Sequence, residues 1–233
     1  MDFSANDGKK IEIQTSQEIW QRFPVKTHFV RPGENIDNII EKYIIGNIKE
    51  TDIVSFSQKI VSLVQNKVIY KKDLKVGFWA KFLSKFVTKT PYGFSVGNPL
   101  KMQVAINMAG LPRIFLAGFL SILGKLIGKR GVFYKVAGHQ VNELDGFYGE
   151  AFKEYLEMGI LGPENCNEWC DRIKGKYGFE NIIADVNDLG GNILGTSSNL
   201  KGKEFLMLEI LKDNPSGQGE QQTPIIILRK SND

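Results

Sequence analysis

The sequence predicts an α/β protein with a mixed arrangement of strands and helices. This prediction rests on apolar, β-prone runs such as residues 51–56 and 181–186, and on segments such as residues 36–44 whose apolar side chains recur at helical spacing. Strands and helices interleaved in this way indicate an α/β or α+β fold. The chain has 233 residues, of which 42% are apolar, so it can bury a core as one large domain or as two small ones.

The expected elements follow from apolar periodicity and from the turn-forming residues between the runs. Strands are expected at residues 9–15, 27–30, 51–56, 131–136, 181–186, 193–195 and 224–228. Helices are expected at residues 36–44, 78–87, 99–109, 112–127, 164–177 and 205–211. We expect residues 1–25 to form an N-terminal extension with an edge strand, and residues 26–233 to form the main domain.

The chain is mildly basic, with a formal net charge of +4 and a pI near 8.9. Its most basic stretch is residues 71–89, where lysines recur at helical spacing opposite aromatic side chains. We interpret this stretch as an amphipathic helix with a solvated basic face; binding to a membrane surface or to an anionic ligand is the alternative. No interaction with nucleic acid is expected.

The apolar segment at residues 114–127 reads IFLAGFLSILGKLI and contains Lys125. It is shorter than the roughly 20 residues that a membrane-spanning helix needs. A buried helix is the favoured interpretation, with a dimer contact or an interfacial helix as alternatives. Association with a membrane is therefore not expected.

The N-terminal residues MDFSANDGKK lack the apolar core of a signal peptide, so a cytoplasmic location is expected. Cys166 and Cys170 are the only cysteines, and His28 and His139 are the only histidines. This set is too small for a typical zinc site, and free thiols are expected in a reducing compartment.

Two segments contain residue types that suit metal ions and phosphates. In NIIADVNDLGGN, a β-prone run leads to Asp185, Asn187 and Asp188. An acid at the exit of a buried strand can hold Mg²⁺ or Mn²⁺ while phosphates fill other positions, but Asp and Asn also end many ordinary strands. In SGQGEQQTP, the glycines allow backbone N–H groups to point into one phosphate-sized concavity; a polar surface loop is the alternative.

Two further segments place polar side chains after apolar runs. In SFSQKIVS, Gln58 and Lys59 follow a buried strand, and Lys59 either meets a phosphate or is simply exposed. In AGHQVNELDG, the polar residues are His139, Gln140, Asn142, Glu143 and Asp145. His139 has no evident partner in the sequence that would make it a general base.

The order of these segments resembles the coenzyme F420-0:L-glutamate (γ-glutamyl) ligase family. Along the chain the segments are SQKIVS, AGHQVNE, ADVND and GQGEQQTP, and the earlier FVRPGENIDNII is similar to the family's opening strand, turn and helix. The resemblance runs from about Thr27 to Arg229, nearly the whole chain. It identifies the protein as a divergent member.

The resemblance implies a fold, a reaction and a set of partners. The fold is an intertwined α/β homodimer. The reaction uses GTP as co-substrate and Mg²⁺ or Mn²⁺ to join the α-amino group of L-glutamate to a carboxylate of an F420-type acid through an acyl phosphate. The implied partners are these small molecules and a second copy of the chain.

The resemblance also implies site residues, position by position. The implied nucleotide-binding residues are Thr27, His28, Phe29, Val30, Gln58, Lys59, Glu143, Ser216, Gly217, Gln218, Gly219, Glu220, Gln221, Gln222 and Thr223. The implied metal positions are Asp185, Val186, Gln140 and Asp145. No catalytic residue is assigned.

Several of these positions depart from the family pattern. Leu63 replaces a lysine, Gln140 replaces a metal-binding Asp, and Gln218 replaces an acid. Fewer carboxylates weaken the hold on Mg²⁺, and Asp145 and Asp213 are candidates to compensate. The alternatives are a relative that joins a different acid and amine, and a non-catalytic relative that binds nucleotide or a membrane surface.

Overall fold

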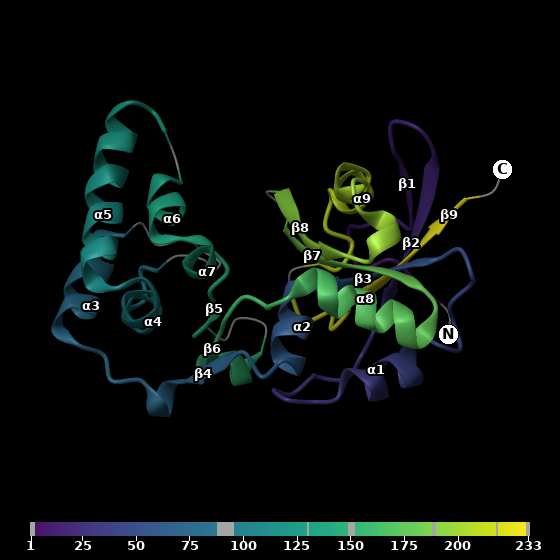
Figure 1. Cartoon of the computed structure of the whole chain (residues 1–233), viewed down its shortest axis with the longest axis horizontal. Helices are drawn as coiled ribbons and strands as arrows, with labels where there is room; N and C mark the ends of the chain where they lie inside the picture. The colour runs from purple at the N-terminus through teal and green to yellow at the C-terminus, as the bar shows by residue number, and fades with distance from the viewer. Residues whose placement is uncertain are drawn as a thin grey trace. The chain divides into compact units, whose positions relative to one another are not determined.

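The computed structural model describes residues 3–87, 96–129, 131–148, 152–187, 190–217 and 219–231. The chain divides into two compact units, whose elements are labelled in Figure 1. Unit 1 comprises Met1–Lys67 and Pro163–Asp233, and unit 2 comprises Val68–Gly162. Each unit contains both strands and helices, which confirms the predicted α/β class.

Unit 1 is built on a six-stranded mixed sheet. Its strands are β1 (Glu12–Gln14), β2 (Ile19–Val25), β3 (Ile53–Ser57), β7 (Glu180–Asn187), β8 (Gly190–Thr196) and β9 (Ile225–Lys230). They lie in the order β1-β2-β9-β3-β7-β8. Among the described residues, β3 and β7 are the one parallel pair, and the other neighbouring pairs in this sheet are antiparallel.

Helices cover both faces of this sheet. Helix α9 (Glu204–Leu211) lies on one face, and α1 (Ile36–Tyr43), α2 (Gln58–Val64) and α8 (Cys166–Tyr177) lie on the other (Figure 1). On the α9 side, Met207 and Ile210 pack against inward residues of the strands, including Ile182 and Ile226. On the other side, Phe56 of β3 meets Trp169 of α8 edge to face at 5.2 Å between ring centroids. The alternation along each strand thus supplies two apolar layers.

The predicted strand at residues 27–30 is wrong, because the chain is irregular there and the strand lies earlier, as β2. The backbone N–H of Thr27 donates to the carbonyl of Gln222 at 2.9 Å, a loop contact in place of a strand ladder. Strand β2 contains Pro24, which has no N–H to donate. Since β1 pairs only with residues 19–21, Pro24 lies beyond the end of β1, at a position that tolerates proline.

Unit 2 is largely helical. Its helices are α3 (Phe78–Leu83), α4 (Pro99–Ala109), α5 (Leu111–Leu126), α6 (Val132–Ala137) and α7 (His139–Asn142). Its described residues also form short strands in the order β4-β6-β5, namely β4 (Val68–Tyr70), β5 (Asp145–Gly146) and β6 (Met158–Ile160). Single 3-10 turns occur at Lys71–Asp73, Ser84–Phe86 and Lys153–Leu156, and a fourth, in unit 1, at Ser198–Leu200.

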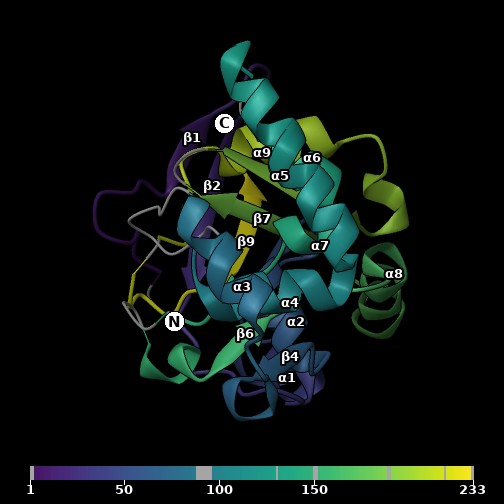
Figure 2. The same cartoon turned by 90° about the vertical axis from the view of Figure 1, so that its left-hand side faces the viewer.

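The predicted strand at residues 131–136 is also wrong, because this segment forms α6. Gly131 adopts a positive φ of 74° and reverses the chain after α5, so that α6 packs back along α5. Val132 and Phe133 have high β propensity, but helix packing overrides it here. Figure 2 shows α5 and α6 in unit 2.

The single amphipathic helix expected at residues 71–89 is wrong. Among its described residues, the stretch contains the turn Lys71–Asp73, helix α3 and the turn Ser84–Phe86, with a non-helical link at residues 74–77. The glycine at position 77 caps α3 and has low intrinsic helix propensity, which helps to explain the interruption.

The predicted burial of residues 114–127 is wrong as well. Helix α5 buries Ile114, Ala117 and Gly124, whereas most of its large apolar side chains are exposed. In the part of the chain that the structure describes, no single helix is long and apolar enough to cross a membrane. Helices α4 and α5 reach that length only as a pair, and they are bent by 114° relative to each other.

Candidate functional site

Strands β3 and β7 bring two predicted site segments together at one end of the unit 1 sheet. They run parallel, and the last residue of β3, Ser57, is in register with Ala184. The residues that follow this pair are Gln58, the first residue of α2, and Asp185 of β7. Because parallel strands end at the same edge of a sheet, these side chains and Lys59 occupy one region, which is where ligands bind in open α/β sheets.

The other predicted segments of unit 1 reach the same end of the sheet. Strand β9 is antiparallel to β3, and the N–H of Ser57 donates to the carbonyl of Pro224 at 2.9 Å. The loop that precedes β9, residues 216–223, therefore lies beside the end of β3. The contact between Thr27 and Gln222 adds residues 27–30 to this group. Four segments that are far apart in the sequence thus converge.

Alternation along β7 separates Asp185 from Val186. Ala184 and Val186 pack with the apolar cluster under α9, so Asp185 faces the other side of the sheet, where α2 begins. Asp185 is half-buried. Strand β7 continues two residues further, to Asn187, and pairs Asp185 with Asn192 of β8. The side chain of Val186 carries no ligand atom, so only its backbone carbonyl is available to a metal ion.

The loop at residues 216–223 is held in shape by its own groups. The N–H of Gly219 donates to Oε1 of Gln221 at 2.7 Å, and Oγ1 of Thr223 donates to the carbonyl of Ser216 at 2.9 Å. Gly217 has a positive φ of 70°, and a Cβ there would lie 2.8 Å from the Gln221 side chain. The positive φ therefore favours glycine, and an added Cβ would displace the Gln221 side chain that binds Gly219.

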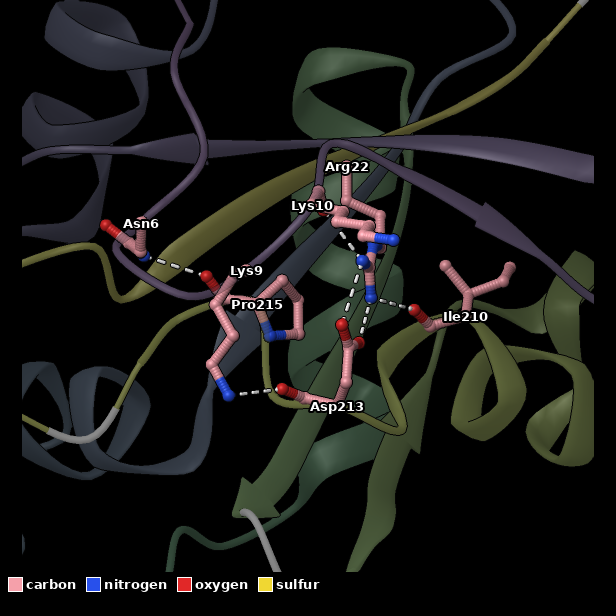
Figure 3. Close-up of polar contacts among 7 residues, drawn as sticks. All are labelled: Asn6, Lys9, Lys10, Arg22, Ile210, Asp213 and Pro215. Carbon is pink, nitrogen blue, oxygen red and sulfur yellow. Dashed lines mark hydrogen bonds and ion pairs between the residues drawn. The ribbon is translucent and has the colours of Figure 1, made fainter.

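Buried Arg22 of β2 supports this loop from the sheet (Figure 3). Its Nη2 donates to Oδ2 of Asp213 at 3.1 Å and to the carbonyl of Lys10 at 2.7 Å, and its Nη1 donates to Oδ1 of Asp213 and to the carbonyl of Ile210 at 3.0 Å. Burial raises the pKa of Asp213, but the hydrogen bonds and charge of Arg22 outweigh it, so this pKa lies below its usual range. Both oxygens of Asp213 thus accept hydrogen bonds from Arg22, and its role as a compensating metal ligand stays a prediction.

Asn6 and Lys9 of the N-terminal segment form hydrogen bonds with the same loop and with the residues just before it. The Asn6 side chain donates to the carbonyl of Pro215 and to Oγ1 of Thr223, both at 2.8 Å. Nζ of Lys9 donates to the carbonyl of Asp213 at 2.6 Å (Figure 3). Residues before the first predicted site segment therefore position the last one.

His28 is held by two side-chain contacts. Its Nδ1 lies 2.8 Å from Oη of Tyr43, and its Nε2 lies 2.6 Å from Oε1 of Glu34. The Tyr43 hydroxyl also accepts from the backbone N–H of His28 at 3.1 Å. These contacts fix the irregular segment that follows β2 against α1.

The remaining predicted residues belong to unit 2. Gln140 is exposed on α7, and Glu143 is buried after it. Oδ1 of Asp145 accepts from the N–H of Gly146 at 2.8 Å and lies 4.0 Å from Nζ of Lys101, which is 1% exposed. A buried ammonium therefore faces Asp145. The side chain of His139 lies outside the described part of the structure, as do Asp188 and Gln218.

Sequence reasoning missed Arg22 and Lys101, the two basic side chains buried deepest among the described residues. Arg22 occupies an inward position of a strand whose other inward residues are apolar. Lys101 occupies a buried position of an otherwise apolar helix face. Each of these basic residues occupies a position where the sequence pattern predicts an inward-facing apolar side chain. Because burying a charge without a partner is costly, such a residue indicates a buried ion pair or hydrogen-bond network.

The metal-binding prediction has limited support from the geometry. Among the described residues, no three His, Cys, Asp or Glu side chains lie close enough together to hold a metal ion. Asp185 brings one carboxylate to the sheet end of unit 1. A single carboxylate fits a hydrated Mg²⁺ that is also bound by substrate phosphates, and it does not fit a metal cage made by protein alone.

We compared the sequence with known protein families. Residues 24–178 match the family described as F420-0:Gamma-glutamyl ligase, which is more than half of the chain. The chain belongs to this family. Membership supports a ligase function of the γ-glutamyl type. No curated protein matches the chain.

The family match covers only part of the candidate site. It includes residues 27–30, Gln58, Lys59 and the unit 2 segment with Gln140 and Asp145. It ends at Gly178, before Asp185 and the loop at residues 216–223. The sheet register is therefore what connects Asp185 and this loop to the matched segments of unit 1.

Proposed function

We propose that this protein is a nucleotide- and divalent-metal-dependent ligase that joins L-glutamate to the carboxylate of a coenzyme F420-type acid. The observation that carries the proposal is the convergence of residues 27–30, Gln58, Asp185 and the loop at residues 216–223 at one end of the unit 1 sheet. The nucleotide is GTP, as the family resemblance implies.

The nucleotide would be held mainly by Lys59 and by the glycine-rich loop. The ammonium of Lys59 supplies positive charge at the end of β3, which suits a phosphate. The loop has glycines at positions 217 and 219, where the backbone can approach a ligand closely, and hydrogen bonds hold its described residues Ser216, Gly219, Gln221 and Thr223. Hydrogen bonds that already hold these residues lower the entropy that binding would cost.

Asp185 would hold Mg²⁺ or Mn²⁺ together with the phosphates. The bound metal would neutralise negative charge that develops on the transferred phosphoryl group. The roles of Glu143 in nucleotide binding and of Gln140, Asp145 and Val186 in metal binding remain predictions, as does the intertwined homodimer.

The proposed reaction has two steps. In the first, a carboxylate oxygen of the acid attacks the γ-phosphorus of GTP, which forms an acyl phosphate and releases GDP. In the second, the α-amino group of glutamate attacks the acyl carbon, the amide bond forms and phosphate leaves. The amine loses a proton in this second step.

Isothermal titration calorimetry with GTP and Mn²⁺ tests the proposal. We expect GTP to bind when Mn²⁺ is present, and Asp185→Ala to abolish the metal-dependent part of binding. Glu50→Ala is the matched control, because Glu50 is an exposed carboxylate just before the opposite end of β3. Absence of heat with both GTP and ATP would refute nucleotide dependence.

A relative that joins a different acid and amine is the second candidate function. Leu63 favours it, because the family has a lysine at this position and Leu63 is 2% exposed within unit 1. Its side chain belongs to the core, so it replaces a polar group by an apolar one. A screen of carboxylate acceptors for nucleoside diphosphate release separates the two candidates, and turnover with the F420 precursor and glutamate would exclude this one.

A further inference from the structure

Unit 2 exposes a continuous apolar surface, which we call the α3–α5 patch. It consists of the exposed apolar side chains of residues 78–86 and 115–127. Phe78 and Phe86 are 70% and 71% exposed, and Phe119 and Leu126 of α5 are 60% and 78% exposed. Such large apolar side chains gathered on one surface usually mark an interaction site.

The two parts of the patch are joined by an aromatic contact. The ring of Trp79 on α3 meets the ring of Phe115 on α5 edge to face at 5.2 Å between centroids. Trp79 also contacts Phe78 and Phe82 at 5.2 Å and 6.1 Å between centroids. Both helices lie on the side of unit 2 that faces the viewer in Figure 2. The patch is therefore one surface.

The inner faces of the same helices are already used by the core of unit 2. Ala80 of α3 and Ile114 and Ala117 of α5 pack in one cluster with Met102 and Ala105 of α4. Within α5, Ile114, Ala117 and Gly124 face inward, whereas most of the large apolar side chains face outward. A surface helix normally directs polar side chains toward water, so an outer face this apolar indicates an apolar neighbour.

Positive charge surrounds the patch. The sequence between Leu74 and Asn142 contains ten Lys and Arg residues and no Asp or Glu. Lys81 and Lys85 are exposed beside the aromatic side chains of α3, and Lys125 and Lys129 are exposed near the end of α5. Aromatic and aliphatic side chains next to lysines are typical of helices that lie in the interface of an anionic bilayer.

A second copy of the chain fits this surface less well. A symmetric dimer through the patch would bring the lysines of both copies toward each other. The sequence of the patch supplies no carboxylate to pair with them. Anionic lipid headgroups attract these lysines, whereas the same patch on a second copy of the chain would repel them.

We propose that the α3–α5 patch docks unit 2 onto an anionic lipid surface, with α5 lying in the plane of the interface. Helix α5 has 16 residues, which is too short to span a bilayer but long enough to present a broad apolar face to the acyl chains. The lysines contact the headgroups. This interaction is separate from the proposed ligase activity and does not depend on it.

Vesicle sedimentation with the full chain tests the proposal. We expect binding to vesicles of phosphatidylcholine with phosphatidylserine, little binding to phosphatidylcholine alone, and loss of binding in high salt. Phe119→Ser/Leu126→Ser removes apolar contacts, and Lys81→Glu/Lys85→Glu reverses two charges. Each double variant should lower the apparent partition coefficient by at least about tenfold. For the lysine pair, this follows because one basic residue near an anionic surface contributes roughly fivefold. For the Phe119 and Leu126 pair, it follows from the loss of two large apolar side chains that the bilayer would bury.

Matched controls come from exposed side chains of unit 1. Phe205→Ser changes a phenylalanine that is 74% exposed on α9, and Lys201→Glu/Lys212→Glu makes the same change in net charge outside the patch. Both should bind vesicles like the unaltered chain. Circular dichroism and thermal melting should show that all variants are folded, because each altered side chain is exposed.

Three results would overturn the proposal. The first is failure of the unaltered chain to sediment with anionic vesicles. The second is an equal loss of binding in the unit 1 controls. The third is a dimer that Phe119→Ser/Leu126→Ser converts to a monomer in analytical ultracentrifugation without any vesicle binding, which would assign the patch to a second copy.

Discussion

Arg22 of β2 and Asp213 form an ion pair through both nitrogens and both oxygens, and this pair joins the sheet of unit 1 to the segment before the glycine-rich loop (Figure 3). The Arg22 side chain is 1% exposed and that of Asp213 is 41% exposed. The pair connects residues 191 positions apart in the sequence. The stability of the fold and the shape of the loop are therefore linked.

Asp213→Asn should lower the free energy of unfolding by about 1–3 kcal/mol, because it leaves the buried guanidinium without its counter-charge. Urea denaturation followed by circular dichroism measures this change. Glu220→Gln is the control, since it removes one exposed negative charge from the same loop. Equal unfolding of Asp213→Asn and the unaltered chain would show that the pair contributes nothing to stability.

The stability supplied by Asp213 should depend on pH. Its pKa in the folded chain lies below the value of about 3.9 expected in the unfolded chain, because Arg22 outweighs the effect of burial. The contribution is thus fully present above about pH 4 and is lost as the pH falls through the folded pKa. Melting temperatures of the unaltered chain and Asp213→Asn should differ by a constant amount above about pH 5 and converge at lower pH. A difference that grew on acidification would contradict this sign.

Gly217→Ala should weaken nucleotide binding more than it weakens the fold. The new Cβ adopts an unfavourable positive φ, which costs about 1 kcal/mol, and it also meets the Gln221 side chain that shapes the loop. Gly202→Ala is the control: its φ is +86°, and no atom lies within 4 Å of its added Cβ. Both variants should lose similar stability, but only Gly217→Ala should raise the Kd for GTP. Equal Kd values for GTP in the two variants would show that the loop does not take part in nucleotide binding.

Lys59→Met should raise the Kd for GTP by roughly tenfold or more, the usual size of one charged hydrogen bond. The expectation rests on the position of Lys59 after the end of β3, beside the start of β9. Lys201→Met, at an exposed position of unit 1, should leave binding unchanged. Titration calorimetry at constant ionic strength compares the two variants. Equal affinity of both variants would assign the lysine to the fold and not to the ligand.

The most regular helices and strands could be predicted from local sequence patterns. The helices around residues 36–44, 99–109 and 164–177 and the strands around residues 51–56 and 181–186 formed as predicted, because their apolar periodicity and capping residues act over a few neighbouring positions. The order of the polar segments also predicted the ligase family. Local periodicity and the order of the polar segments can both be recognised in a single sequence.

Which of these segments lie together depends on long-range contacts that the fold makes. The parallel register of β3 and β7 places Ser57, which Gln58 follows, opposite Ala184, which Asp185 follows, and the antiparallel register of β9 adds the glycine-rich loop. Residues 131–136 became a helix because they pack against α5, and α5 exposed the apolar side chains that its composition suggested were buried. Strand pairing and helix docking depend on contacts between residues that are distant in the sequence, and local propensity carries no information about them.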